Sequence, residues 1–420
     1  MDLIEFYASM IQLKRFFILL LVAVLYTSLG AQNSNSVYSR YGYGIFDQPA
    51  MGSSKAMAGV GFSLHEGKLL NVLNPAAQAD VDTLNLLYDI SMTSQITKMS
   101  ENGLKQSNSN LYFDHVGMKF ALKRHWGMAL GLYSTSKTGF EFYQIHEIDD
   151  TQIGDLNYTN SYKGSGGIST VFLGTGFRLF EGLSLGVNAK YAFGNLYNTM
   201  TTVYQTSGIS SESNYEYLFV RYPGLDLGMQ YDMKMSEKSL LTIGASYAMY
   251  PKVKNEFLTT EISSDTVENS QFYDFKMADA LGLGITYKYD KRLIVSLDFQ
   301  KKFFENALYM GVKDSLKNAT DLAVGVEYLP STKTDNFLEA IRYRGGFRYS
   351  DQYLKVPGKL KSAALTFGFG LPLRGSRSML NLGFELGKLI TPNRSLIQET
   401  YFKMSFGVTF NEMWFFDSKL

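Results

Sequence analysis

From residue 84 to the end of the chain, apolar and polar residues alternate with a period of two. Between residues 183 and 193 every second residue is aliphatic or aromatic, and the residues between them are Ser, Gly, Asn, Lys or Ala. The same alternation runs through residues 225–232, 380–387 and 402–410. Such a pattern predicts β-strands that have one apolar and one polar face.

The alternating segments are joined by short turns and by long connections, and these two kinds of connection alternate along the chain. Short turns are predicted at 124–125, 180–182, 234–238, 289–291, 330–336 and 374–376. Long polar connections are predicted at 101–109, 143–162, 206–214, 252–270, 305–317, 351–358 and 391–394. Short turns at one end and long loops at the other are typical of outer-membrane barrels. We therefore predict an all-β fold, a transmembrane antiparallel β-barrel of about 14 strands over residues 83–420.

The competing fold is a soluble β-sandwich or propeller. Strands of soluble sheets usually run for about 5–6 residues, and several alternating segments here are much longer and end in aromatic residues. The length of these segments favours the membrane barrel.

The first 31 residues have the pattern of a secretory signal peptide. Lys14 and Arg15 precede an apolar run at 16–25, and small residues follow up to Ala31. A membrane anchor is the alternative, but the run is too short to cross about 30 Å of hydrocarbon as a helix. Met10 is an alternative start to Met1. The signal implies export, and with the barrel it implies the outer membrane of a Gram-negative bacterium.

Composition narrows the function classes. The net charge is +1, without long charged runs, which argues against a nucleic-acid surface. Aromatic residues make up 15% of the chain, with 38 Gly and only 8 Pro, as expected for long antiparallel strands with tight turns. Cysteine is absent, which excludes disulfides, thiolate metal sites and a lipoprotein anchor.

Residues 32–82 do not follow the barrel pattern. Ala56–Ala79 is rich in small residues and contains the sequence Asn74, Pro75, Ala76 directly before the first strand. Leu69–Ala79 is predicted to form a short helical turn that ends near Asn74 and Pro75, because proline fixes φ and favours a sharp bend. We interpret residues 32–82 as an N-terminal extension and a small hatch inside the barrel.

This hatch sequence resembles that of the FadL-like outer-membrane transport proteins. The resemblance rests on Asn74, Pro75 and Ala76, and on the barrel-like strand at 182–194. It implies a 14-stranded barrel plugged by a hatch that carries an Asn-Pro-Ala signature. It also implies binding and passage of a hydrophobic ligand when the hatch shifts. Members usually continue with Gly-Leu where this chain has Ala77 and Gln78, and Phe410 is followed by ten further residues.

Many positions that alternation places toward the lumen are glycines. Two interpretations remain open: the glycines leave room for the hatch, or they ease the curvature of the strands. The positions are Gly174, Gly176, Gly228, Gly244, Gly282, Gly284, Gly325, Gly346, Gly368, Gly370, Gly383 and Gly387.

Charged residues also fall on lumen positions. One interpretation is a site for a carboxylate head group among the arginines, and the other is a network of paired charges that holds the hatch. The second is favoured, since both signs are mixed and buried charges are normally paired. The residues are Lys119, Asp226, Asp298, Glu327, Arg342, Arg344, Arg348 and Glu385.

The sequence carries no recognisable catalytic, cofactor or metal motif. The four histidines form no metal-binding pair, and no set of nucleophile, base and orienting group is visible. We expect no enzyme activity and no cofactor. Two function classes remain: a passive transporter of hydrophobic small molecules, and a non-conducting barrel in an envelope secretion or assembly machine, such as the type IX secretion shuttle that some FadL-like barrels resemble. The expected partners are membrane lipid with either a small apolar ligand or envelope proteins.

Overall fold

The computed structural model describes residues 36–81, 85–101, 103–150, 154–205, 210–313, 316–332, 336–355, 358, 360–373, 377–393 and 396–413. The predicted signal peptide, residues 1–31, lies outside the described residues, as do residues 414–420.

Long strands dominate the described part of the chain. They are β1 (Ile45–Phe46), β2 (Asn85–Glu101), β3 (Leu104–Lys123), β4 (Trp126–Asp150), β5 (Gly154–Phe180), β6 (Leu183–Tyr204), β7 (Glu212–Ser236), β8 (Ser239–Met249), β9 (Lys252–Ile262), β10 (Thr266–Lys276), β11 (Ala280–Tyr289), β12 (Leu293–Lys302), β13 (Ala319–Tyr328), β14 (Arg342–Asp351), β15 (Lys361–Pro372), β16 (Met379–Ile390) and β17 (Gln398–Met413). The helices are short: η1 (Val37–Arg40), η2 (Gly52–Met57), η3 (Pro75–Ala79), η4 (Phe304–Asn306) and α2 (Phe337–Ala340). None of these helices is long and apolar enough to cross a membrane.

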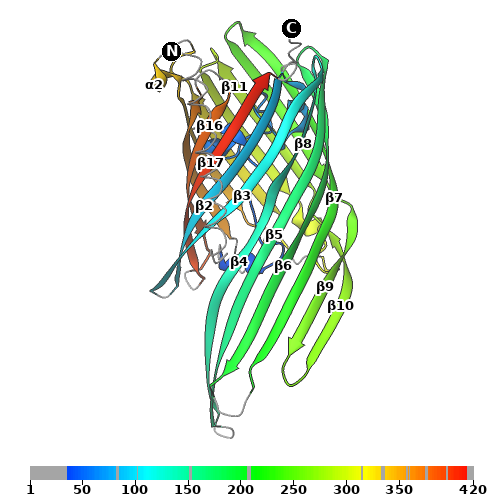
Figure 1. Cartoon of the computed structure of the whole chain (residues 1–420), viewed down its shortest axis with the longest axis vertical. Helices are drawn as coiled ribbons and strands as arrows, with labels where there is room; N and C mark the ends of the chain where they lie inside the picture. The colour runs from blue at the N-terminus through cyan, green and yellow to red at the C-terminus, as the bar shows by residue number, and fades with distance from the viewer. Residues whose placement is uncertain are drawn as a thin grey trace, which may run out of the picture.

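Fourteen of the strands close into one antiparallel barrel, as the sequence predicted. Strands β2 to β8 pair in chain order, β8 pairs with β11, and β11 to β17 again pair in order. Pairing of β17 with β2 closes the barrel, so the wall has no free edge through the membrane. The β9–β10 hairpin lies between β8 and β11 in the chain, but it leaves the barrel wall and pairs with β7 (Figure 1).

The two faces of the wall follow the alternation of the sequence. On β7, Leu225, Leu227 and Met229 are exposed on the outer surface, whereas Asp226 and Gln230 are buried in the lumen. Apolar side chains therefore face the lipid and polar side chains face the interior, as in outer-membrane barrels.

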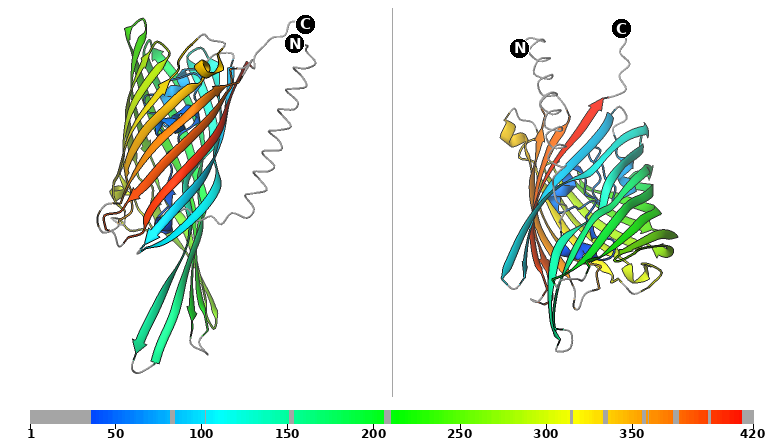
Figure 2. Two further views of the ribbon diagram at one scale, coloured as in Figure 1. Left: turned by 90° about the vertical axis from the view of Figure 1, so that its left-hand side faces the viewer. Right: turned by 60° about the horizontal axis from the view of Figure 1, so that its bottom comes forward.

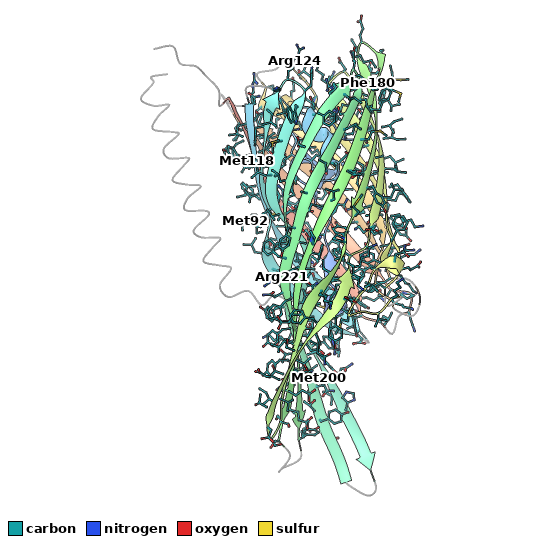
Figure 3. The ribbon with its side chains drawn as sticks, turned by 90° about the vertical axis from the view of Figure 1, so that its right-hand side faces the viewer. Met92, Met118, Arg124, Phe180, Met200 and Arg221 are labelled. Atoms are coloured by element: carbon teal, nitrogen blue, oxygen red, sulfur yellow. The ribbon has the colours of Figure 1, made fainter. Side chains whose placement is uncertain are left out.

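The connections differ between the two ends of the barrel. We call the end with the connections at 124–125, 181–182, 237–238 and 290–292 the short-turn end, which lies at the top of Figure 1, and the opposite end the long-loop end. In Figure 3, Arg124 and Phe180 lie at the short-turn end, Met92 and Met118 lie along the wall, and Met200 lies on an extension beyond the long-loop end.

Three of the predicted long loops are in fact paired strands. Most of residues 101–109, 143–162 and 252–270 continue the hairpins β2–β3, β4–β5 and β9–β10. These stretches have no apolar face because they extend past the lipid-facing wall, so the absence of alternation in hydrophobicity gave the wrong prediction. Strand β17 likewise continues three residues past Phe410 to Met413.

The N-terminal segment, residues 36–81, runs through the lumen from the long-loop end to the short-turn end. Helix η1 contacts β4, η2 contacts β13 to β16, and η3 contacts β5, β6 and β7. Its blue ribbon is visible inside the barrel in Figures 1 and 2. The predicted helical turn exists but begins at Pro75 rather than ending there, because Asn74 caps it and proline suits the first helical position.

Glycines of the wall form rows where the N-terminal segment approaches. Gly127, Gly176, Gly186 and Gly228 are partners across four neighbouring strands. A Cβ atom on Gly186 would lie 2.3 Å from the carbonyl carbon of Pro75. Further contacts of this kind occur at Gly244 and Gly282 with Phe62, Gly284 with Ser63, Gly325 and Gly346 with Met57, and Gly368 with Ala56. Most of the predicted lumen glycines thus make room for the segment, while Gly174, Gly370 and Gly387 face other wall side chains.

A Gly244→Ala variant tests whether the close contact matters. The added Cβ would lie 1.9 Å from the backbone oxygen of Phe62, so the segment must shift, and we expect a loss of about 1–3 kcal/mol of unfolding free energy. Gly383→Ala is the control, because its nearest neighbours lie at ordinary contact distance, 3.7 Å or more. Urea titration of both variants refolded in lipid vesicles measures the difference. Equal effects of the two changes would contradict the account.

Candidate functional site: the contact between the N-terminal segment and the wall

The Asn-Pro-Ala sequence of the hatch lies across the row of wall glycines. Asn74 is fully buried, and its Oδ1 accepts a hydrogen bond of 3.1 Å from the N–H of Ala76. Its Nδ2 donates to the carbonyl oxygens of Phe62 (2.6 Å), Met229 (3.0 Å) and Ala245 (3.2 Å). One side chain therefore caps η3 and joins two parts of the hatch to strands β7 and β8.

The two residues at which the chain departs from the FadL-like pattern also hold the hatch. The carbonyl oxygen of Ala77 accepts a hydrogen bond of 3.0 Å from Lys119. Gln78 is buried, and its Nε2 donates to the carbonyl oxygen of Asn71 at 2.5 Å. The first contact joins the segment to strand β3 of the wall, and the second stabilises the fold of the segment itself.

Two of the predicted lumen charges bind the backbone of the hatch directly. The Lys119 ammonium, on β3, also donates to the carbonyl oxygens of Leu69 (3.3 Å) and Glu66 (3.4 Å). Asp298, on β12, accepts from the N–H groups of Gly61 (2.6 Å) and Phe62 (3.0 Å). A wall cation thus stabilises backbone carbonyls and a wall anion stabilises backbone amides, as expected for charge-assisted hydrogen bonds.

The other predicted lumen charges pair among wall residues in separate places. Asp226 pairs with Lys190 at 2.6 Å, and Glu385 lies 3.6 Å from Lys403. Glu327 binds Arg344 at 2.6 Å and also Arg342, and Arg348 lies 3.9 Å from Asp321. The eight residues do not form one network. The arginines lie beside carboxylates of the wall, an arrangement of paired charges.

A second group of charges in the middle of the lumen joins the N-terminal segment to the wall, and only Glu385 of this group was predicted. We call it the lumen charge cluster; it consists of Asp47, Lys55, Asp114, Lys137, Glu385 and Lys403. Asp47 of the segment binds Lys137 and lies 3.1 Å from Lys403. Lys55 of the segment binds Asp114 and donates to Thr93 at 2.8 Å. Glu385 and Lys403 lie on inward positions of the alternation, whereas Asp114 sits at a β-bulge, where the pairing of β2 with β3 shifts register next to His115. The partners of all these wall residues depend on where the segment crosses the lumen.

Asp47 is the charge on which this cluster depends. Burial alone would raise the pKa of its carboxyl group, but the ammonium groups of Lys137 and Lys403 outweigh this effect and hold the pKa well below its usual range. Asp47 is therefore ionised throughout the neutral pH range.

The lumen charge cluster lines a cavity of about 180 Å³ between the segment and the wall. Toward the long-loop end the cavity borders Phe46, Phe304 and Tyr353. These rings pack with further aromatic side chains into what we call the aromatic cap: Tyr43, Phe46, Phe275, Phe304, Tyr309 and Tyr353. The Tyr353 hydroxyl accepts from the N–H of Tyr43 and donates to the carbonyl oxygen of Gly44, both at 2.8 Å. The segment thus contacts the wall at three levels of the lumen.

Within the described ranges, His, Asp and Glu side chains form no group of three or more that is placed to hold a metal ion. His115, which alternation places in the lumen, lies 3.2 Å from the carboxylate of Asp89. Chemically, the arrangement is suited to fixing a segment in place.

Asp47→Asn tests the charge cluster. Asp47 is partly exposed to the cavity, and its removal leaves Lys137 and Lys403 with less compensating charge, so we expect a loss of about 1–3 kcal/mol of unfolding free energy at pH 7. The pKa of Asp47 is lower in the folded protein than in the unfolded chain, where it is about 3.9. The stabilisation that its carboxylate gives to the folded state is therefore complete above the unfolded-chain pKa and is lost as pH falls toward the lowered folded-state pKa.

Urea unfolding of both proteins in lipid vesicles at several pH values between 8 and 3 measures this difference. We expect a constant difference down to about pH 5 and a smaller one below. Glu181→Gln is the control, because its ion pair with Lys234 is fully exposed and screened by solvent, so we expect no measurable change in unfolding free energy. A difference that already declines between pH 8 and pH 6 would contradict the assignment.

No curated protein sequence matches the chain. Solved structures match its fold: the Pseudomonas putida toluene transporter TodX (TM-score 0.58, 16% identity, 88% of this chain and 100% of that chain), a Pseudomonas aeruginosa FadL homologue (0.59, 11%, 86% and 98%) and the CymD monoaromatic hydrocarbon channel (0.56, 12%, 88% and 100%).

At these identities the likeness shows the fold alone. That fold is the 14-stranded barrel of FadL type, a fold of outer-membrane channels. The sequence model of the family described as BamG matches residues 10–420. The chain therefore belongs to the BamG family.

Proposed function

We propose that this chain is a non-conducting barrel subunit of the machinery that assembles β-barrel proteins in the outer membrane. The name of its family supports an association with that machinery. The envelope proteins of the assembly machinery would then be its partners, with outer-membrane lipid around the wall. Export through the signal peptide at residues 1–31 is part of this proposal, and catalysis has no place in it.

The observation that carries the proposal is the fixed N-terminal segment. Asn74 and Lys119 hold it at the short-turn end, and Asp47 and Lys55 hold it at mid-lumen. At the long-loop end, Glu399 of β17 accepts hydrogen bonds from the hydroxyl of Ser36 (2.9 Å) and the N–H of Val37 (3.0 Å). A transport path would require most of these contacts to break together.

Transport of a hydrophobic small molecule is the competing proposal, and the lumen gives it less support. An apolar ligand crossing the cavity would meet the lumen charge cluster, and sites for such ligands are normally lined by hydrophobic and aromatic side chains. Toluene transport is stated for TodX, and the likeness of this chain to TodX is one of fold.

Native mass spectrometry of the protein extracted from its own membrane in mild detergent tests the proposal. We expect a stoichiometric complex with protein components of the barrel-assembly machinery and no apolar ligand. Another outer-membrane barrel carrying the same affinity tag, at similar abundance, is the control. Recovery of the chain alone with a bound fatty acid or aromatic compound would contradict the proposal and favour transport.

A further inference from the structure

Three hairpins extend past the long-loop end and form one open sheet. They are β4–β5, β6–β7 and β9–β10, and the order in the sheet is β4, β5, β6, β7, β9, β10. Figure 2 shows this extension reaching well beyond the other strands. Unlike the barrel, the open sheet has two edge strands, β4 and β10, and the backbone groups of an edge can pair with another strand.

Near the barrel, the edge of β4 is already covered by the N-terminal segment of the same chain. Strand β3 separates from β4 beyond the pair His115 and Tyr133. Strand β1 then pairs with β4, and Ser36 donates to the carbonyl oxygen of Gly139 at 3.1 Å. This edge therefore accepts an added strand, and β1 is an example of one.

Beyond Gly139, no ladder partner covers this edge among the residues that the structure describes. Because hydrogen-bonding direction alternates along a strand, the backbone groups of Glu141, Tyr143, Ile145 and Glu147 face the edge as those of Gly139 do. The side chains of Tyr143 and Ile145 are 62% and 69% exposed, and the Tyr143 hydroxyl lies 3.3 Å from the carboxylate of Glu141. The edge thus combines unpaired backbone groups with two exposed apolar side chains between two glutamates.

We propose that residues 141–147 of β4 bind an extended strand of a protein partner by β-strand addition. The partner strand continues the line of β1 on the same edge, with apolar side chains opposite Tyr143 and Ile145 and basic side chains near Glu141 and Glu147. This inference rests on the proposed function, since the partner is then a component of the assembly machinery.

The opposite edge, β10, is less suited to this role. Leu308 exchanges two hydrogen bonds of 3.0 Å with Lys276, and the N–H of Gly311 donates to the carbonyl oxygen of Asp274 at 2.8 Å. On the edge-facing positions beyond these contacts, Phe272 is exposed but is followed toward the tip by Ser270 and Glu268. The same sheet therefore provides a matched control edge.

Proline substitutions separate the two edges. Ile145→Pro removes an N–H that faces the open edge and leaves the pairing of β4 with β5 intact, because proline is tolerated at such edge positions. Ser270→Pro makes the same change on β10. In pull-downs from native membranes, we expect Ile145→Pro to reduce the recovered assembly components by about tenfold and Ser270→Pro to leave them unchanged. Ile145→Thr, which keeps the N–H, should retain part of the binding.

A photoreactive phenylalanine analogue at position 143, with position 272 as the control, identifies the neighbour directly. We expect a crosslink at 143 to one of the proteins recovered in the complex, and none at 272. Crosslinks only to a second copy of this chain, or full recovery of the complex with Ile145→Pro, would overturn the edge proposal while the proposed function stands. Absence of any complex with the unmodified chain would overturn both. Heat-modified mobility of each variant on gels verifies that the barrel has closed.

Discussion

Close contact between the N-terminal segment and side-chain-free stretches of the wall is the constraint on which the rest of the structure depends. Where Pro75 crosses Gly186, or Phe62 crosses Gly244, backbone meets backbone with no space for a Cβ atom. This closeness brings Asn74 within reach of two wall carbonyls and Asp298 within reach of two hatch amides. The position of the segment in turn sets which wall charges meet Asp47 and Lys55 farther along the lumen.

Sequence alone predicted most of the fold and only part of the site. Alternation identifies the lumen face correctly, as Asp226 and Gln230 illustrate, because a period of two follows directly from strand geometry. It cannot predict that Asp298 binds the backbone of Gly61, since that contact depends on the path of the segment. It also missed the strands beyond the long-loop end, because a sheet with water on both faces has no apolar side to reveal it. Apart from Glu385, the lumen charge cluster was not predicted, because its pairing also depends on the path of the segment.

The proposed function depends on what the lumen of this barrel contains. The solved relatives named as hydrocarbon transporters share the fold of this chain at low identity. In this chain the side chain of Gln78, at a position that departs from the FadL-like pattern, hydrogen-bonds within the hatch to the carbonyl oxygen of Asn71. Paired charges occupy the middle of the lumen. In the proposed function, a barrel that holds its own N-terminal segment in the lumen and carries a projecting sheet outside acts through its surfaces.

The measurement that tests the filled lumen most directly is the conductance of the full-length protein in planar lipid bilayers, beside a variant lacking residues 36–80. The account predicts no steady conductance from the full-length chain and open channels from the deletion variant, because removing residues 36–80 takes away the segment's contacts with the wall at the short-turn end, at mid-lumen and at the long-loop end. Steady conductance through the full-length chain, or no gain on deletion, would contradict it.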